Sequence, residues 1–355
     1  MSHEPADNSE GVHGRAEPPD SLVENHNDDG AARRTRMRIR RRVTGRRLDK
    51  YLHDRFPRMS RTVLQKLIKQ GEITVNGLPT KASYEPAAGD VLEVLIPPPP
   101  PNDVTPEDIP VDIVHEDDHI VAINKHAGII CHPAGPAQGG TIANAMAFHA
   151  TTLSHGDDPY RPGIVHRLDK NTTGVMLIAK SDEAHWRLSL QFERRTTQKT
   201  YFGICEGEPS RDQDLINQPL GAHPMIKDRY MNPGQLPRAM LFKEAITQYA
   251  VKERLKGFAI VHMYPKTGRT HQLRVHMSAI GHPLMGDTYY GGHLFSERDI
   301  AGEGDAEPLI STQALHAMAI EFVHPITEKP MRIEAPLPEN LQRIVDLLRE
   351  HRKYP

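Results

Sequence analysis

The chain has 355 residues, of which 37% are hydrophobic and 25% charged, and its formal net charge is −2. This length is enough for two domains and a tail, and no apolar run approaches the roughly 18 residues that a membrane-spanning helix needs. The N-terminus lacks the charged-then-apolar layout of a secretory signal. Cys131 and Cys205 both lie within apolar segments. We therefore expect buried free thiols and a cytoplasmic protein.

The nearly neutral total hides a strong separation of charge near the N-terminus. Residues 4–29 are mostly acidic, whereas residues 33–47 contain nine arginines and no acid. This composition predicts a disordered tail over residues 1–42. The arginine run favours contact with RNA, since cationic side chains gain affinity by releasing counterions from phosphates. A tail that only increases solubility is the alternative.

Residues 43–96 are predicted to form a small α+β domain with two short helices and two strands. Apolar side chains recur at helical spacing, and cap, stop and turn residues stand between the elements. The residues and ranges that carry this prediction are Leu48, Tyr51 and Leu52 for the first helix, Ser60 to Gly71 for the second, 72–75 and 91–96 for the strands, and Asn76-Gly77 for the turn.

This segment resembles the alpha-L motif, an RNA-binding module shared with a small-subunit ribosomal protein. The resemblance rests on the pattern SRxxxQKxIxxGxxxVNG, which begins at Ser60. It implies that the helices carry basic residues to RNA. The candidates are Arg58, Arg61, Lys66 and Lys69. A solvated helix face is the alternative for each of them.

Five prolines at residues 97–101 predict a stiff polyproline II linker, extending to about residue 108, ahead of a larger domain over 109–355. The sequence His115-Glu-Asp-Asp-His119 matches the zinc-protease pattern. That pattern binds zinc only on a helix, and two aspartates between apolar runs indicate a hairpin turn instead. We find no other metal-ligand spacing and predict no metal site.

A polar loop stands out in the segment RPGIVHRLDKNTTGVMLIAK, residues 161–180. The apolar runs 163–165 and 175–179 predict two strands. Asp169 is the only carboxylate in the nine-residue loop between them, and Arg167 and Lys170 flank it. Nearby cations favour an ionised carboxylate, which suits a nucleophile. An aspartate that merely caps a turn is the alternative.

Further elements are predicted on both sides of this loop. Apolar periodicity and cap residues indicate strands at 109–113, 119–123, 200–204, 244–251, 258–263 and 315–323, and helices at 141–149, 182–191 and 341–349. The segment 267–276 is predicted to be a turn followed by a helix, with Thr270 as its cap.

Four collinear stretches resemble the pseudouridine synthases of the RluA type, which modify large-subunit ribosomal RNA and some transfer RNA. They are INKHAGIICHPA (residues 123–134), HRLDKxTTGxxxxAK (166–180), PKTGRTHQLRVHMSAIGHPLMGDTYYGG (265–292) and ALHAMAIEFVHP (314–325). The resemblance implies an α+β fold with a mixed, largely antiparallel sheet, flanking helices and a cleft. It also implies an isomerase that needs no cofactor and a monomer whose partner is RNA.

The resemblance further implies roles for individual residues. Asp169 is the expected nucleophile, Tyr201 is expected to pack against the target base and take part in proton transfer, and Arg274 is expected to pair with Asp169. Arg269 is the alternative arginine. Candidate RNA contacts in the motifs are His166, Arg167, Lys170, Arg269 and His271. Two positions depart from the family pattern, namely His126 in place of a proline and Thr312 in place of a frequent arginine.

The predicted function is the isomerisation of specific uridines, most similar to the large-subunit ribosomal RNA enzymes, with transfer RNA as the second choice. The target base must leave its helix, because stacking shields the reacting atoms, and Arg167 is placed to fill the gap or grip phosphate. A non-catalytic RNA-binding protein and an aspartate-dependent hydrolase are the rivals. A glycosidase would need a second carboxylate, and a phosphatase would need acids that hold magnesium. Neither stands near Asp169 in the sequence.

Overall fold

The computed structural model describes residues 21–27, 33–40, 45–56, 59, 61–96, 104–133, 139–150, 152–155, 161–226, 229–232 and 241–355. It divides the chain into two compact units, Met1–Pro99 and Pro100–Pro355. The whole proline run, Arg58, Ser60 and residues 134–138 lie outside the described residues. No helix in the part of the chain that is described is long and apolar enough to cross a membrane.

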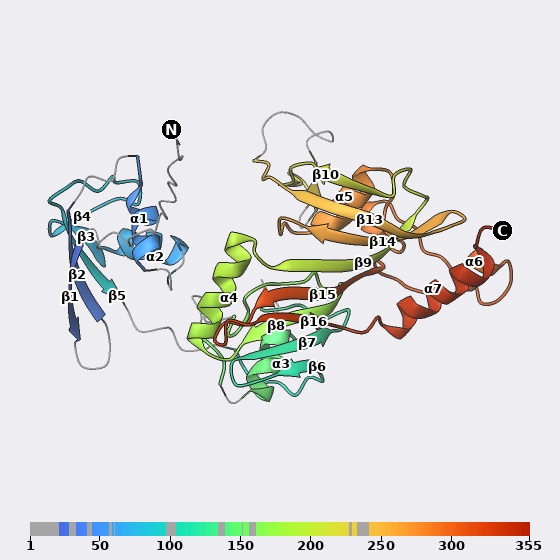
Figure 1. Ribbon diagram of the computed structural model, residues 1–355, viewed down its shortest axis with the longest axis horizontal. Coiled ribbons are helices and arrows are strands. Elements are labelled where there is room, and N and C mark those ends of the chain that lie inside the picture. Colours follow the sequence, from blue (N-terminus) through green and yellow to red (C-terminus); the bar gives the residue numbers. More distant parts are fainter. Residues whose placement is uncertain are drawn as a thin grey trace, which may run out of the picture. The chain divides into compact units, whose positions relative to one another are not determined.

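The first unit is an antiparallel sheet of five strands, with two helices packed on one face (Figure 1). The strand order is β1-β2-β5-β3-β4. Its elements are β1 (Ser21–Asn27), β2 (Arg33–Ile39), α1 (Leu48–Arg55), α2 (Arg61–Gln70), β3 (Ile73–Val75), β4 (Leu78–Pro79) and β5 (Val91–Ile96). The apolar faces of the two helices and the inward residues of β2, β3 and β5 share one core. The predicted helices, strands and Asn76-Gly77 turn are confirmed here, and both turn residues have positive φ.

Strand β2 contradicts the prediction of disorder up to residue 42. It pairs with β5 along its length, from Arg33 opposite Ile96 to Arg38 opposite Val91. Met37 and Ile39 are buried in the core, whereas the alternate residues Arg34, Arg36, Arg38 and Arg40 are exposed. Residues of a strand alternate between the two faces of its sheet, so this segment of the arginine run has the two-residue period of a half-buried strand.

The second unit is built on a nine-stranded sheet in the order β10-β13-β14-β9-β15-β8-β7-β6, with β16 pairing β15. Among the described strands of this sheet, the pairing of β15 with β8 is parallel and the other pairings are antiparallel. The strands are β6 (Asp112–Glu116), β7 (Ile120–Lys125), β8 (Thr173–Ala179), β9 (Gln198–Glu206), β10 (Gln213–Asn217), β13 (Ile246–Leu255), β14 (Phe258–Pro265), β15 (Leu315–Val323) and β16 (Pro330–Glu334). A separate small hairpin joins β11 (Gly221–Ala222) and β12 (Tyr230–Met231).

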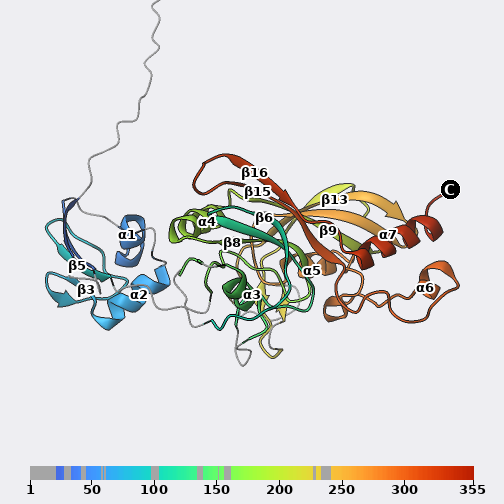
Figure 2. The same cartoon turned by 90° about the horizontal axis from the view of Figure 1, so that it is seen from below.

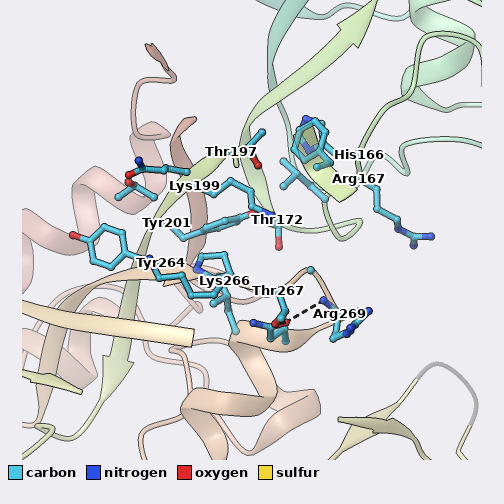
Figure 3. Close-up of a pocket in the computed structure, with 18 of the residues that line it drawn as sticks. His166, Arg167, Thr172, Thr197, Lys199, Tyr201, Tyr264, Lys266, Thr267 and Arg269 are labelled. Atoms are coloured by element: carbon cyan, nitrogen blue, oxygen red, sulfur yellow. Dashed lines mark hydrogen bonds between the residues drawn. The ribbon is translucent and has the colours of Figure 1, made fainter. Parts of the chain in front are cut away.

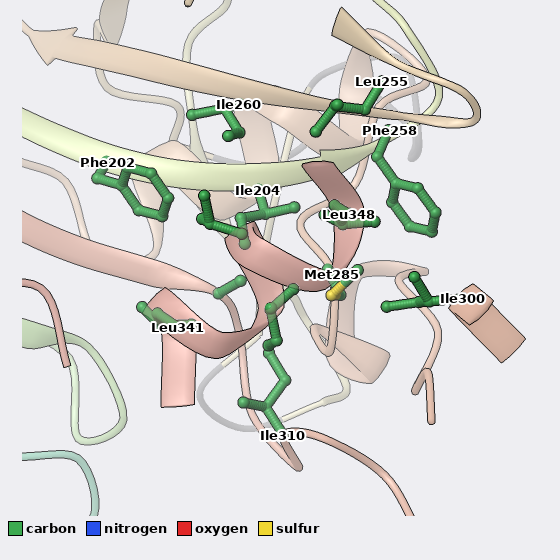
Figure 4. Packing of buried hydrophobic residues seen from close by; sticks show 13 residues of the cluster. Phe202, Ile204, Leu255, Phe258, Ile260, Met285, Ile300, Ile310, Leu341 and Leu348 are labelled. Atoms are coloured by element: carbon green, nitrogen blue, oxygen red, sulfur yellow. The ribbon is translucent and has the colours of Figure 1, made fainter. Parts of the chain in front are cut away.

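Helices pack along this sheet (Figure 2). They are α3 (Ile142–His149), α4 (Asp182–Arg194), α5 (Gln272–Ala279), the short η2 (Thr288–Tyr290), α6 (Glu297–Ala301) and α7 (Glu339–His351). Leu341, Ile344 and Leu348 of α7 pack against Ile204 of β9 and Ile260 of β14 in a buried apolar cluster (Figure 4). The C-terminal helix thus fixes the two central strands from one side.

Gly174 fixes the point where β8 meets β15. A Cβ atom at this glycine would lie 2.2 Å from the carbonyl oxygen of Ala317, and its φ is +113°. The parallel pairing here joins Gly174 to Ala317, and Thr173 Oγ1 lies 2.8 Å from Nδ1 of His316. No other residue tolerates so close an approach of two backbones, so the glycine anchors the end of the polar loop to the centre of the sheet.

The predicted α+β class is confirmed, and several boundaries are corrected. Residues 163–165 form no strand, and only Ile164 makes an isolated bridge with Ile178. The first strand predicted in this unit begins later, at Asp112. The N-cap position of helix α5 is His271, in the left-handed conformation and without a side-chain capping hydrogen bond, rather than Thr270. The sequence interpretation also omitted β10, β11, β12, β16 and α6.

Candidate active site

The polar loop that carries Asp169 is held in place by hydrogen bonds to buried side chains. Lys125 is 1% exposed, and its ammonium donates hydrogen bonds to the carbonyl oxygens of His126 at 2.7 Å and Lys170 at 2.9 Å. The thiol of Cys131 lies 3.2 Å from the carbonyl oxygen of Leu168 and 3.3 Å from its backbone nitrogen. Burial lowers the pKa of Lys125 to about 8, and the charge of Asp169 opposes that shift. The loop backbone therefore has little freedom next to the carboxylate.

Asp169 has charged neighbours, but no described residue is a close hydrogen-bonding partner for its side chain. Its Oδ2 lies 3.9 Å from Nη1 of Arg274, and its Oδ1 lies 4.0 Å from Nε2 of His271. Its side chain is 19% exposed. Among the described residues these are the nearest ion-pair contacts that the carboxylate makes. Both oxygens stay available to a ligand while the guanidinium supports the negative charge.

Arg274 forms its bidentate pair with Asp287, and the expected pairing with Asp169 is present as a longer ion pair of 3.9 Å. Nε and Nη2 of Arg274 each lie 2.7 Å from a carboxylate oxygen of Asp287. The two side chains are 9% and 1% exposed. Burial alone would lower the pKa of Arg274, but the bond to Asp287 outweighs it and the pKa is raised. The guanidinium also lies 4.9 Å from the ring centroid of Tyr290.

Tyr201 projects from β9 into a cavity (Figure 3) that Asp169 also lines. Its ring packs against two buried apolar clusters. Burial, reinforced by the negative charge of Asp169, raises the pKa of its phenol. The side chain is therefore a protonated hydroxyl on a flat ring, which can stack against a base and donate a hydrogen bond.

His271 lies beside the carboxylate rather than at an outer RNA-binding surface. Its backbone has a φ of +57°, and its Nδ1 lies 2.7 Å from the hydroxyl of Tyr290. Tyr230, Tyr289 and Tyr290 all contact its ring edge-to-face. Burial lowers its pKa, against the opposing charge of Asp169. The imidazole is thus held neutral and oriented towards Asp169.

His166 has a packing role at the wall of the larger cavity, and the RNA contact expected from the motif stays a prediction. Its ring stacks on Phe192 with centroids 4.6 Å apart, and its Nε2 accepts a hydrogen bond from the backbone nitrogen of Leu177 at 2.8 Å. Burial, with a smaller effect of Lys199, lowers its pKa to about 3. A neutral, stacked histidine joins the start of the loop to β8.

Two cavities meet at Asp169, His271 and Arg274. The larger has a volume of about 950 Å³ and extends past Tyr201 to Lys199, Tyr264 and Lys266 (Figure 3). The smaller, about 400 Å³, extends past Lys170, Asn171 and Tyr289. The larger volume is in the range of pockets that enclose small organic ligands. A ligand that fills it would place its atoms next to the carboxylate of Asp169 and the phenol of Tyr201.

The comparisons with known proteins identify the family. A model described as RNA pseudouridylate synthase matches residues 119–279, and an S4 domain model matches residues 46–92. An uncharacterised RNA pseudouridine synthase of Synechocystis sp. is 36% identical over 307 residues, which cover 86% of this chain and 90% of the relative. The chain belongs to the RNA pseudouridine synthases. It is therefore an isomerase that acts on RNA, with an S4 domain that binds RNA.

Two further similarities support this assignment. The ribosomal large subunit pseudouridine synthase D of Pseudomonas aeruginosa is 37% identical over 313 residues, covering 87% of this chain and 94% of that protein. The solved structure of human RNA pseudouridylate synthase domain containing 4 superimposes with a TM-score of 0.51 at 25% identity. It covers 67% of this chain and 93% of the human one.

The pseudouridine synthase unit presents the remaining motif residues in different ways. Arg167 is exposed where the loop borders the larger cavity, and Lys170 is exposed beside the smaller one. Arg269 donates from Nε to the carbonyl oxygen of Glu244 at 2.9 Å, so it stabilises the loop before α5. His126 lies in an exposed pair with Asp112, with 2.6 Å between the nitrogen and the carboxylate.

The S4 unit does not expose all of its predicted RNA contacts equally. Lys66 and Lys69 are exposed on α2, and Arg58 lies outside the described residues. Arg61 donates to the buried carboxylate of Asp49 at 2.7 Å, together with Arg47 and Gln65. Burial of Asp49 would raise its pKa, but these hydrogen bonds hold the pKa well below its usual range. Arg61 thus connects α2 to α1, although 41% of its side chain stays exposed.

Several site residues were missed by the sequence interpretation, which named none of Asp287, Tyr290, Lys125 and Lys199 as functional. The first two stood within the quoted motif at residues 265–292, but spacing alone does not reveal which carboxylate receives Arg274. The segment 115–119 lies on the β6–β7 hairpin, where Asp117 accepts hydrogen bonds from the backbone of His119 and Ile120. In the described part of the chain no group of three or more His, Cys, Asp or Glu side chains could hold a metal ion.

Proposed function

We propose that this synthase converts specific uridines of large-subunit ribosomal RNA into pseudouridine, with Asp169 as the nucleophile. The arrangement of Asp169, Arg274 and Asp287 carries the proposal. Because Asp287 takes both strong hydrogen bonds of Arg274, the guanidinium lies near Asp169 without occupying its oxygens. A carboxylate that is partly exposed and accepts no hydrogen bond from the described residues is suited to attack a ligand in the adjoining cavity.

The chemistry requires no net redox change or hydrolysis. The bond between N1 of uracil and C1′ of ribose breaks, the base turns, and C5 joins C1′. C5 loses a proton and N1 gains one, so atoms and electrons balance without a co-reactant. Asp169 can form a transient covalent bond either at the sugar or at the base, and both routes begin with the same carboxylate oxygen.

Tyr201 is suited to hold the base while it turns. Its ring can stack on uracil without specifying one edge of the base, which a rotation of the base demands. Its raised pKa keeps the phenol protonated. The hydroxyl therefore donates a hydrogen bond to the detached base and can exchange its proton only when another group supplies or takes one.

The size and charge of the larger cavity support a target nucleotide that has left its helix. The cavity volume of about 950 Å³ accommodates a flipped nucleotide with neighbouring atoms. Arg167 is exposed at the edge of this cavity, where it can fill the gap left in the stack or contact a phosphate. The S4 unit supplies additional affinity for RNA.

The choice of ribosomal RNA over transfer RNA is supported by the names of the relatives. The relatives from Xylella fastidiosa, Xanthomonas campestris, Pseudomonas aeruginosa and Zymomonas mobilis are each named ribosomal large subunit pseudouridine synthase D. We place the reaction in the cytoplasm, where two buried free thiols such as Cys131 and Cys205 persist in reduced form.

The test is a map of pseudouridine in total RNA by carbodiimide labelling and primer extension. Three strains are compared, carrying the wild-type protein, no protein, or Asp169→Ala. Loss of the same sites in large-subunit ribosomal RNA from the last two strains is expected. Loss of the sites only in the deletion strain would show that Asp169 is not the nucleophile. Loss of pseudouridine sites in transfer RNA alone would show that transfer RNA, and not ribosomal RNA, is the substrate.

A further inference from the structure

The larger cavity contains a cation that the proposed chemistry leaves unused. Lys199 lies on β9 two residues before Tyr201, and both side chains line the cavity. Residues i and i+2 of a strand share a face and lie about 7 Å apart. Figure 3 shows Lys199 and Lys266 among the lining side chains, with Tyr201 and Tyr264. This arm of the cavity therefore continues from the position proposed for the base.

Lys199 is partly buried in the wall of this cavity and, unlike Arg195 and Arg332 there, has no ion-pair partner among the described residues. Within the described residues no carboxylate lies within ion-pair distance of its ammonium, and its nearest ring contact is Phe192 at 5.9 Å from the centroid. By contrast, Arg195 pairs with Glu244 at 3.1 Å, and Arg332 pairs with Glu334 at 2.6 Å. Burial lowers the pKa of Lys199, and no neighbouring acid offsets this shift. Burying an unpaired ammonium costs free energy, which a bound anion would recover.

The backbone opposite this ammonium is open to a ligand. A Cβ atom placed on Gly268 would have one heavy atom within 4 Å, namely Nζ of Lys199 at 3.9 Å. Gly268 also lines the same cavity, in the loop between β14 and α5. Lys266, two residues earlier, is exposed and lines it as well. A ligand can thus reach the ammonium and the backbone of the loop at the same time.

We propose that Lys199, with the backbone at Gly268 and the side chain of Lys266, forms a subsite for one phosphate group of the RNA strand next to the target uridine. This inference rests on the proposed function. A base held at Tyr201 leaves the RNA backbone that carries it about 7 Å away, which is the spacing between Tyr201 and Lys199 along the strand. An RNA strand carries one phosphodiester anion per nucleotide, and an ammonium binds it as a point charge. The subsite would position the strand, whereas Asp169 and Tyr201 act on the nucleoside.

The first experiment measures RNA binding by filter retention as a function of salt, with an in vitro transcript of large-subunit ribosomal RNA. Lys199→Met removes the charge at similar length, Lys199→Arg retains it, and Lys329→Met is the matched control at an exposed lysine that lines neither cavity. Lys199→Met is expected to weaken binding about tenfold or more and to reduce the salt slope by about one ion. Lys199→Arg should keep the slope. An unchanged slope in a folded Lys199→Met protein would overturn the proposal.

The second experiment identifies the phosphate. Synthetic RNA stem-loops around a mapped target uridine carry a neutral methylphosphonate at one position each. At one position next to the target, the methylphosphonate should weaken wild-type binding but not further weaken Lys199→Met. Additive losses at every position would overturn the subsite. Pseudouridine formation by the wild-type protein is measured in the same RNAs, so a substrate that binds but is never modified would count against the proposed reaction and not against the subsite.

Discussion

Arg274 donates two hydrogen bonds of 2.7 Å to Asp287, while its remaining terminal nitrogen lies 3.9 Å from Asp169. The buried carboxylate holds the arginine, and the arginine in turn provides positive charge to the carboxylate that faces the cavity. Gly286 precedes Asp287 with a φ of +76°, and a Cβ atom there would lie 2.3 Å from the carbonyl oxygen of Thr312. The close backbone contact between Gly286 and Thr312 thus fixes the position of Asp287, which in turn positions Arg274.

Replacement of Asp287 by asparagine should damage both stability and activity. It leaves the buried guanidinium of Arg274 without its counter-charge, a change that typically costs about 3–5 kcal/mol of unfolding free energy. Denaturant unfolding measures that loss. Pseudouridine formation should fall by a larger factor than RNA binding, because Asp287 does not lie at the proposed phosphate subsite. Equal stability of Asp287→Asn and wild type would contradict the assignment of this pair.

Removal of the Tyr201 hydroxyl should separate stacking from hydrogen bonding. Tyr201→Phe retains the ring against the base, whereas Tyr201→Leu loses the aromatic face. Binding of RNA is expected to be near wild type in the first variant and weaker in the second, by about 1–3 kcal/mol for a lost base–aromatic stack. Single-turnover pseudouridine formation should be slower in both. A Tyr201→Phe enzyme with full rate would show that the hydroxyl has no part in proton movement.

His166 should give this protein a specific sensitivity to acid. Its folded pKa of about 3 is below its ordinary value of 6.5. The unfolded state therefore binds the proton first as pH falls, and His166 lowers the unfolding free energy progressively from about pH 6.5 towards pH 3. His166→Gln keeps an acceptor for the backbone of Leu177 but does not titrate. The stability difference between wild type and this variant should shift in favour of the variant between pH 6.5 and pH 4, as measured by urea unfolding. A constant difference would exclude the predicted titration.

The exposed row of arginines on β2 should contribute to RNA affinity through charge. Arg34, Arg36 and Arg38 point away from the core of the S4 unit, and of these Arg36 has Glu93 at 3.6 Å. Changing all three to glutamine should weaken RNA binding and reduce the salt slope by about two ions. The same three positions changed to lysine are the matched control and should retain the slope. If the glutamine and lysine variants behave alike, the row does not bind phosphates through its charge.

Local sequence signals predicted those elements whose conformation depends mainly on a few adjacent residues. The period of Leu48, Tyr51 and Leu52 predicted α1, and the Asn76-Gly77 pair predicted the hairpin, because helical periodicity and positive φ are properties of a few adjacent residues. The signal in Arg33–Ile39 was also local. Its alternation of arginine with Thr35, Met37 and Ile39 has the period of a strand, but the high charge was interpreted as disorder.

The sequence by itself determined the family and three residues that line the cavities, Asp169, Tyr201 and Arg274, because the motifs are collinear and specific. Only the tertiary structure determined which charged side chains lie next to these residues. Arg274 lies near both aspartates, and its two short hydrogen bonds to Asp287 depend on the contact of Gly286 with Thr312 in the segment before β15. That no described acid pairs with Lys199 likewise depends on side chains that are distant in sequence. Electrostatic energies depend on distance and burial in three dimensions, and neither quantity can be obtained from residue order.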